Sequence, residues 1–355
     1  MLYIAIFVIF YIYCVSLCNK PYTKQDKVLK IGAAVIAVLI GFRKGWPDED
    51  AYLFAFNGAP YLNEFSWDTQ PLAYAELGYF YLASVIKTIY FNSTFYFLVM
   101  GGLSMYLLYK CLDKYCLLPL IGFCDYIARF LLNRDFTQMR SSLAILLIVI
   151  ATKYIYEKKM WKYMLVVLLA YQFHHSASLA IPLYFFCMLN LKHWHIVTGI
   201  LVAFPLAAIF APSISVLLSD WSEDLQIQTY TEGGDVEQAL GFANPMIYFQ
   251  IAVLLLFTFR EKQLTRLTPY YNIFRTGYFY STLFLIFFCN YTALSGRTAT
   301  IFATFEMFIL SALTLTFSGV QRKIYFTSLV VILSYFFYSK YWAAMMMTNG
   351  AAGFF

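Results

Sequence analysis

Long uninterrupted apolar runs recur along the chain, and they limit its fold more than any other feature. The run at residues 164–186, MLVVLLAYQFHHSASLAIPLYFF, is long enough to cross a bilayer. Backbone polar groups inside hydrocarbon must be hydrogen-bonded within the protein, so runs of this kind form helices. Their apolar residues are continuous rather than alternating, which argues against an outer-membrane β-barrel. The sequence therefore predicts an all-α fold.

The composition of the chain is typical of a membrane protein. Of the 355 residues, 61% are hydrophobic and 12% are charged, whereas about 25% of the residues in a soluble domain are charged. The seven cysteines are scattered and form no pattern typical of a zinc site or a disulfide framework. The net charge of +6 is spread over loops and does not indicate nucleic-acid binding. We expect a single integral membrane domain over residues 1–355, without a cofactor.

Apolar windows predict a polytopic transmembrane helical bundle of about 11 to 13 membrane segments. Several windows are shorter than an ideal bilayer-crossing helix, so broken or re-entrant helices are expected among them. The windows lie at residues 2–18, 28–42, 75–91, 94–109, 116–132, 137–156, 163–189, 194–218, 245–259, 271–289, 298–317 and 324–340.

Lysine and arginine orient these segments, because loops rich in both residues stay on the cytoplasmic side. Such residues cluster at 20–30, 153–162, 260–266 and 322–323, and we expect these loops inside. By contrast, residues 219–244 contain acidic residues but no lysine or arginine. The outer loops are therefore predicted at 43–74 and 219–244.

Two segments disturb the count of crossings. Four windows lie between residues 43 and 158, and two lie between residues 158 and 219. An even number of crossings returns the chain to the same side of the membrane, whereas the two ends of each interval are expected on opposite sides. The segments that carry ionisable residues, 116–132 and 163–189, are the expected exceptions. We predict that both are broken or re-entrant, because irregular backbone at membrane depth is tolerated where it lines a cavity. A break in the second segment places His174 and His175 at an apex that faces outward.

Ionisable residues gather on the expected outer side of the membrane. Arginine is always charged and binds phosphate through its planar fork, so several converging arginines suit a phosphate or pyrophosphate. A histidine or carboxylate beside them would take a proton from an attacking hydroxyl. The candidate site residues are Arg43, Asp48, Glu76, Arg134, Arg140, His174, His175 and Arg297.

Each candidate also has a simpler explanation. Arginines at the ends of spans act as interfacial anchors or extend their charged ends into water. The acidic residues 48–50 resemble the Asp-x-Asp metal motif of some sugar transferases, but acids in a polar loop are usually solvated, and we expect no metal site. The histidine pair is compatible with a buried, hydrogen-bonded structural role.

Short motifs follow one another in order along the chain. They are RKGWPD at 43–48 with Tyr52 and Phe56, ELGY at 76–79, RSSLA at 140–144, and FHHSA at 173–177 with Pro182. Together they resemble motifs of the EpsG family of Wzy-like bacterial polysaccharide polymerases. The resemblance selects His174 as the functional histidine and leaves His175 at a variable position. Arg297 lies where the family often has an arginine before a late span.

The resemblance implies a glycosyltransferase that polymerises oligosaccharide repeat units linked to undecaprenyl pyrophosphate. The growing glycan would pass from its lipid carrier to the nonreducing end of a new unit, at the outer face of the bacterial inner membrane. The product would be O-antigen, capsule or exopolysaccharide. The resemblance also implies a GT-C-like bundle without a metal requirement, and it leaves room for a chain-length regulator as a partner.

Residue roles follow from this expectation. Arg140 and Arg297, aided by Arg43 and Arg134, would hold the pyrophosphate, while His174 or Glu76 would orient or deprotonate the acceptor hydroxyl. Two alternatives stay open. A membrane O-acyltransferase also places a histidine in a buried polar pocket, and a transporter or flippase of lipid-linked sugar also uses broken helices.

Overall fold

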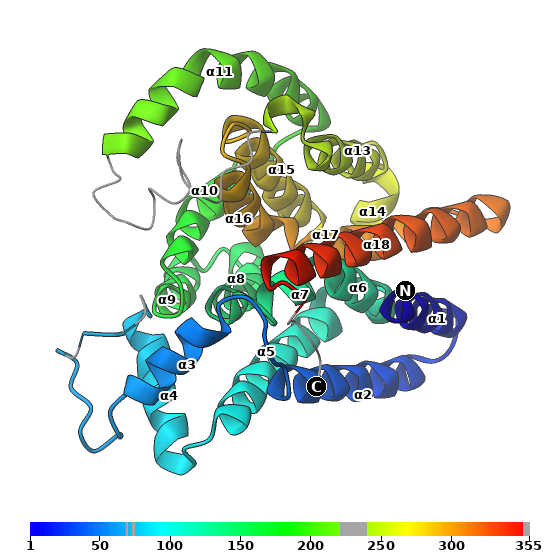
Figure 1. The fold of residues 1–355 in the computed structure, drawn as a ribbon. Helices are drawn as coiled ribbons and strands as arrows, with labels where there is room; N and C mark the ends of the chain where they lie inside the picture. Colours follow the sequence, from blue (N-terminus) through cyan, green and yellow to red (C-terminus); the bar gives the residue numbers. More distant parts are fainter. Residues whose placement is uncertain (69, 73–74, 221–239, 351–355) are drawn as a thin grey trace. The chain divides into compact units, whose positions relative to one another are not determined.

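The computed structural model describes residues 1–68, 70–72, 75–220 and 240–350, and Figure 1 shows that they consist mainly of helices. Helices account for 79% of the described residues, and no β-strand occurs among them. The expected all-α fold is therefore confirmed. Most of the predicted outer loop 219–244 lies outside the described residues.

Most helices begin and end close to the predicted apolar windows. Four of the described helices are long and apolar enough to cross a membrane, and five shorter apolar helices accompany them. The helices that match single windows are α1 (Leu2–Leu17), α2 (Tyr22–Gly41), α4 (Leu77–Ile89), α5 (Ser93–Tyr115), α8 (Met139–Tyr156), α11 (His193–Asp220), α13 (Pro245–Phe259), α15 (Tyr271–Phe287) and α18 (Gly319–Met347).

The chain packs as two compact units. Unit 1 consists of residues 1–181 and 310–355, and unit 2 consists of residues 182–309. Whether the whole chain forms one integral membrane domain, as the sequence predicts, stays a prediction.

Close helix packing in unit 1 brings the end of α2 to the beginning of α8. Gly101 lets α5 approach α2 closely, because a Cβ atom at this position would lie 2.8 Å from the Ile40 side chain. On another face of α5, the Ser104 hydroxyl lies 2.9 Å from that of Ser142 on α8. The residues after α2 and the first turn of α8 therefore lie at the same end of the bundle.

The segment predicted at 116–132 is interrupted, as expected. It consists of α6 (Pro119–Tyr126), one π-helical turn η1 (Ile127–Leu131) and the short α7 (Leu132–Arg134). Asp135 follows α7 and is buried, and its carboxylate accepts hydrogen bonds from Ser142 (2.7 Å), Tyr126 (2.8 Å) and Ser104. These three hydroxyls supply the partners that a buried carboxylate requires.

The segment predicted at 163–189 is also broken, at the histidine pair. Helix α9 (Met160–Tyr171) ends before it, the 3-10 helix η2 (His175–Ala180) begins within it, and α10 (Ile181–Met188) follows. His174 has an extended backbone with φ −161° and ψ 125°, which separates the two helices. The break is confirmed, and its outward orientation stays a prediction.

Three features of the fold differ from the expected pattern of helices. The short helices α3 (Glu49–Gly58) and α14 (Glu261–Leu267) lie in regions predicted as loops. The single window at 298–317 contains two helices, α16 (Thr292–Ala303) and α17 (Glu306–Thr314). Glu306 follows this break, is fully buried and accepts a hydrogen bond from Tyr278 at 2.5 Å.

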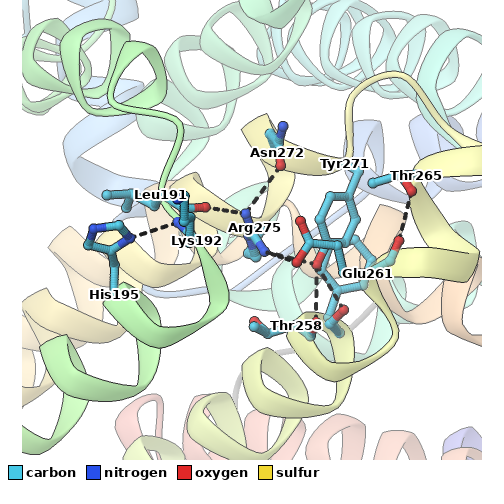
Figure 2. A network of polar contacts seen from close by, with 10 residues as sticks. Leu191, Lys192, His195, Thr258, Glu261, Thr265, Tyr271, Asn272 and Arg275 are labelled. Carbon is cyan, nitrogen blue, oxygen red and sulfur yellow. Dashed lines mark hydrogen bonds and ion pairs between the residues drawn. The ribbon is translucent and has the colours of Figure 1, made fainter.

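Figure 2 shows the polar network around Arg275, a buried residue of α15 in unit 2. Its guanidinium donates to the backbone carbonyl of Leu191 and to Asn272, and it lies 3.3 Å from the Glu261 carboxylate. Arg275 therefore joins α14 and α15 to the chain that leads into α11. This role could not be predicted, because Arg275 is the one charged residue in the apolar window at 271–289.

Candidate functional site

The ion pair of Glu76 and Arg140 lies at the centre of the candidate site in unit 1. Glu76 immediately precedes α4, and Arg140 lies in the first turn of α8. Arg140 Nη1 donates to Glu76 Oε2 at 2.8 Å, and their side chains are 21% and 6% exposed. The other carboxylate oxygen, Oε1, accepts the backbone N–H of His175 at 3.2 Å. One carboxylate thus joins three of the predicted site residues.

Gly78 allows α4 to approach the chain before the histidine pair. A Cβ atom at Gly78 would lie 2.6 Å from Cβ of Gln172 and 2.9 Å from its carbonyl oxygen. The neighbouring Tyr79 N–H donates to the same carbonyl at 3.1 Å. The glycine and tyrosine of the ELGY motif therefore fix Glu76 beside residues 172–175.

The two histidines have different environments. His174 is partly buried, and its Nδ1 accepts the backbone N–H of Ser176 at 3.2 Å and lies 2.7 Å from the Ser176 hydroxyl. The His175 ring is exposed and packs against Tyr171 at 4.7 Å between ring centroids. His174 thus caps η2 with its ring, while His175 contributes its backbone N–H to the site.

Arg43 is held rigidly just beyond the end of α2. Its side chain is 2% exposed, and Nη1 donates to the carbonyls of Asp135 at 3.0 Å and Phe136 at 2.9 Å. The Phe97 ring lies 4.2 Å from the guanidinium carbon. Within the part of the chain that the structure describes, Nε and Nη2 are buried and make no hydrogen bond. These two nitrogens form one complete edge of the guanidinium fork.

We call Nε and Nη2 the open edge of Arg43, because their hydrogen-bonding capacity is unused. This open edge makes Arg43 suited to bind an oxyanion. The Nε and Nη2 groups of arginine match two oxygens of a phosphate or carboxylate in a bidentate arrangement. Burial lowers the pKa of the Arg43 guanidinium from its ordinary value, because removal from water disfavours the charged form. A bound oxyanion would offset that cost and supply the missing hydrogen bonds.

A group of tyrosines connects Arg43 with Arg140. The buried Tyr52 ring has its centroid 5.7 Å from the Arg43 guanidinium carbon and 5.9 Å from that of Arg140. The Tyr79 ring lies 6.0 Å from the Tyr52 ring, and its hydroxyl is hydrogen-bonded to that of Tyr96. Two arginines, one carboxylate and several phenols thus form one continuous polar region inside unit 1.

Asp48 lies at the edge of this region. It is exposed, precedes α3, and has a left-handed backbone with φ 63°. The following Glu49 accepts the Trp46 N–H at 3.2 Å, and burial raises the pKa of its carboxyl. Across residues 1–68, 70–72, 75–220 and 240–350, no three His, Cys, Asp or Glu side chains gather in a metal-binding group. The substrate-binding role of Asp48 stays a prediction.

Arg134 and Arg297 lie on other helices than the Glu76–Arg140 pair, on α7 and α16. Arg134 is buried at the end of α7, and its guanidinium carbon lies 4.2 Å from the Phe130 ring centroid. Arg297 is exposed on α16 and belongs to unit 2. Its expected contribution to the same site stays a prediction.

Sequence reasoning missed several residues that build the site. Tyr96 lies within an apolar window and gives no separate signal there. Asp135 lies between two candidate segments, and only its three hydroxyl partners reveal its role. Lys87 donates to the carbonyls of Asn57 (2.7 Å) and Ala59 (2.6 Å), so it holds the end of α3. Tyr52 and Tyr79 were marked in advance, as parts of the first and second motifs.

Comparison with known proteins identifies the family. The model of the EpsG family matches residues 27–350, which includes all eight predicted site residues. The chain belongs to the EpsG family. This is a family of Wzy-like polysaccharide polymerases. The match and the apolar helices together establish a multi-pass membrane protein similar to a polysaccharide polymerase. No curated protein and no solved structure matches the chain.

Proposed function

We propose that this EpsG-family protein polymerises undecaprenyl-pyrophosphate-linked oligosaccharide units into a surface polysaccharide. The reaction would take place at the outer face of the bacterial cytoplasmic membrane, in a GT-C-like bundle that needs no metal. The observation that carries the proposal is that the buried Nε and Nη2 groups of Arg43, close to the Glu76–Arg140 pair, make no hydrogen bond within the described part of the chain. This edge suits a pyrophosphate, and the carboxylate suits a sugar hydroxyl.

The reaction breaks one bond and forms another at the anomeric carbon of the donor sugar. The acceptor hydroxyl oxygen attacks this carbon, the bond from carbon to pyrophosphate oxygen breaks, and undecaprenyl pyrophosphate leaves with the bonding electrons. Negative charge grows on the leaving oxygen in the transition state. Arg43 and Arg140 would stabilise that charge, because fixed donors in a site without water act strongly on developing charge. Arg297 of unit 2 would assist them.

Glu76 is our candidate for the group that receives the acceptor proton. Its carboxylate is fixed by Arg140 and by the His175 N–H, so its orientation is set before substrate binds. Pyrophosphate that draws Arg140 toward itself would leave Oε2 of Glu76 without its present partner, so that this oxygen is in place to accept the proton of the hydroxyl.

His174 would act as a hydrogen-bond donor rather than as the base. Because its Nδ1 accepts the Ser176 N–H, the proton of a neutral ring resides on Nε2. An Nε2–H group donates to an acceptor hydroxyl or to a pyrophosphate oxygen. We therefore assign deprotonation to Glu76 and orientation to His174, with His175 supplying its backbone N–H. Asp48 would contact the sugar at the edge of the site.

Complementation of a deletion strain tests the proposed function. Cells that lack the gene would carry single repeat units on their surface, and the native gene would restore a ladder of chain lengths on a gel of surface polysaccharide. We expect Arg43→Gln to leave single units, while Lys44→Gln, a change at the neighbouring exposed position, restores the ladder. A flippase would instead leave its substrate on the inner leaflet, and an acyltransferase would leave the chain length unchanged. Either phenotype contradicts the proposal.

A further inference from the structure

The segment between α2 and α5 leaves and returns at one end of this helix pair. The two helices are antiparallel: a Cβ atom at Gly41, the last residue of α2, would lie 3.0 Å from Cβ of Leu98 near the start of α5, and Tyr109 late in α5 donates to Asp26 early in α2 at 3.1 Å. Residues 43–92 therefore begin and end on the same side. The other end carries the lysine-rich first loop, which we expect inside, so this segment is expected outside.

Helices α3 and α4 are too short to cross a membrane. They contain 10 and 13 residues, whereas a crossing helix needs about 20. The chain between them runs back along α4: the Lys87 ammonium donates to the Ala59 carbonyl at 2.6 Å, and the Leu62 N–H donates to Thr88 Oγ1 at 2.8 Å. Irregular backbone of this kind needs water or protein around it. We therefore expect residues 59–68 to form a loop beside α4 that faces water.

The distribution of positive charge agrees with a segment that does not cross. Without a crossing at α4, three of the four windows between residues 43 and 158 remain. An odd number of crossings places residues 43 and 158 on opposite sides of the membrane, as their lysine-rich and lysine-poor surroundings require.

Three aromatic rings from this loop and α4 lie together. The Trp67 and Tyr81 rings are stacked, with centroids 5.3 Å apart and an angle of 22° between their planes. The Phe65 ring lies edge-on to both of them, at 5.5 Å and 5.1 Å. Trp67 is 66% exposed, so most of its surface is open to a ligand. We call these three rings the aromatic platform.

Local contacts fix the platform before any ligand binds. Phe65 packs against the buried cluster that contains Tyr52 and Tyr79 of the candidate site. The Asp68 N–H donates to the Ser66 hydroxyl at 3.2 Å, which holds the turn that carries the indole. A surface that is already ordered loses little conformational entropy on binding.

Helix α4 connects the platform with the Glu76–Arg140 pair. On its buried face, the Tyr79 ring centroid lies 6.0 Å from the Arg140 guanidinium carbon. Tyr81 lies on a partly exposed face of the same helix. It follows Glu76 by five residues, which is about 7.5 Å along a helix. An oligosaccharide bound at the site can therefore reach the rings.

Charge around the platform disfavours an anionic ligand. The segment 45–86 contains no lysine or arginine, and its acidic residues are Asp48, Glu49, Asp50, Glu64, Asp68 and Glu76. Anionic lipid headgroups attract basic segments instead. The face of an aromatic ring is partly negative and attracts the C–H groups of a sugar ring, and carboxylates accept hydrogen bonds from sugar hydroxyls. This combination fits an uncharged sugar.

We infer that the aromatic platform binds an uncharged sugar ring of the glycan whose lipid pyrophosphate is held by Arg43. The inference rests on the proposed function, which supplies this glycan. One face of the sugar would pack on the exposed indole of Trp67, while Glu64 and Asp68 accept hydrogen bonds from its hydroxyls. The platform would hold the sugar chain without touching the reacting atoms, so Trp67 is a binding residue and not a catalytic one.

Binding of a glycan without its lipid carrier tests the inference. The probe is the repeat-unit oligosaccharide, released by mild acid from the lipid carrier of cells that lack the gene and titrated calorimetrically into the purified full-length protein. We expect Trp67→Ala to weaken binding by about tenfold, as for the loss of one good ring contact, and Trp67→Phe to retain most of it. The control Trp161→Ala removes a similarly exposed indole (76%) at the start of α9 and should bind like the native protein.

The kinetics of chain growth separate a binding role from a structural one. In Trp67→Ala the KM for lipid-linked units should rise by about tenfold while kcat is unchanged, because the contact is equally strong in the ground state and the transition state. Unchanged affinity and KM would overturn the inference and leave the rings as anchors at the membrane interface. A fall in kcat alone would also contradict it.

Two further outcomes concern the kind of sugar and the proposed function. Equally tight, Trp67-dependent binding of a uronic-acid oligosaccharide would contradict the assignment to an uncharged sugar. Trp67-dependent binding by a native protein that forms no polymer would support the platform while refuting the proposed function. Chain growth that is identical in the native protein and Trp67→Ala would refute the platform and leave the proposed function in place.

Discussion

A few strong contacts fix the positions of individual side chains in the site. Glu76 receives Arg140 on one oxygen and a backbone N–H on the other, and Arg43 is fixed by two carbonyls and one ring. These contacts leave each group in one orientation. At this scale the two arginines differ, because Arg140 already has a carboxylate partner and Arg43 has an open edge.

Charge and shape at the Glu76–Arg140 pair are separable by substitution. Glu76→Gln keeps the shape of the side chain but removes its basicity, so we expect polymerisation to fall by about 10² or more, the usual effect of losing a general base. Arg140→Lys keeps the charge but loses the planar fork, and we expect about a tenfold loss. The rate of chain-length growth in isolated membranes measures both effects. Glu157→Gln, in an exposed ion pair with Lys159, is the control, and full activity of Arg140→Lys would contradict the bidentate role.

At the scale of helices, the hydropathy of the sequence predicted much of the structure. Most windows correspond to helices because a membrane helix needs a long apolar run. The breaks near Arg129 and at His174 were also predicted, because ionisable residues within such runs need a cavity or partner. Helix α3 was missed because residues 49–58 mix acidic and apolar residues. The break before Glu306 was missed, although Glu306 is the one ionisable side chain in the window at 298–317.

Helix α4 packs closely against Gln172, so a single methyl group added at Gly78 should disturb this packing. Gly78→Ala would place Cβ 2.6 Å from the Gln172 side chain and 2.9 Å from its carbonyl oxygen. We expect a loss of about 1–3 kcal/mol of stability, as is usual for overpacking, together with loss of polymerisation because Glu76 moves. The matched control is Gly102→Ala on α5, where no atom lies within 4 Å of the added Cβ. Thermal unfolding in detergent measures the difference, and equal midpoints for both variants would refute the packing argument.

The whole molecule has features that no single window reveals. The approach of Arg43 to the carbonyls at 135 and 136 depends on how α2, α5 and α8 pack, and sequence spacing carries no information on such tertiary contacts. The family match extends over both units, whereas the candidate site geometry lies in unit 1. The orientation of the site toward the cell exterior rests on the distribution of lysine and arginine.

Thiol labelling in cells measures this orientation. All seven native cysteines are buried, so a cysteine at an exposed position should dominate the reaction. A membrane-impermeant maleimide applied to spheroplasts should label Asp50→Cys, which lies beside the site, and should spare Lys158→Cys until the membrane is permeabilised. The reverse pattern would place the site in the cytoplasm and exclude an extracellular polymerase.

Reconstitution gives the most direct test of the central claim, which is that the open edge of Arg43 holds the pyrophosphate during glycan transfer. Purified protein would receive undecaprenyl-pyrophosphate-linked repeat units, and both chain growth and released undecaprenyl pyrophosphate would be measured. We predict one released carrier for each linkage formed, with both products lost together in Arg43→Gln and retained in Lys44→Gln. Chain growth by Arg43→Gln at the native rate would contradict the claim.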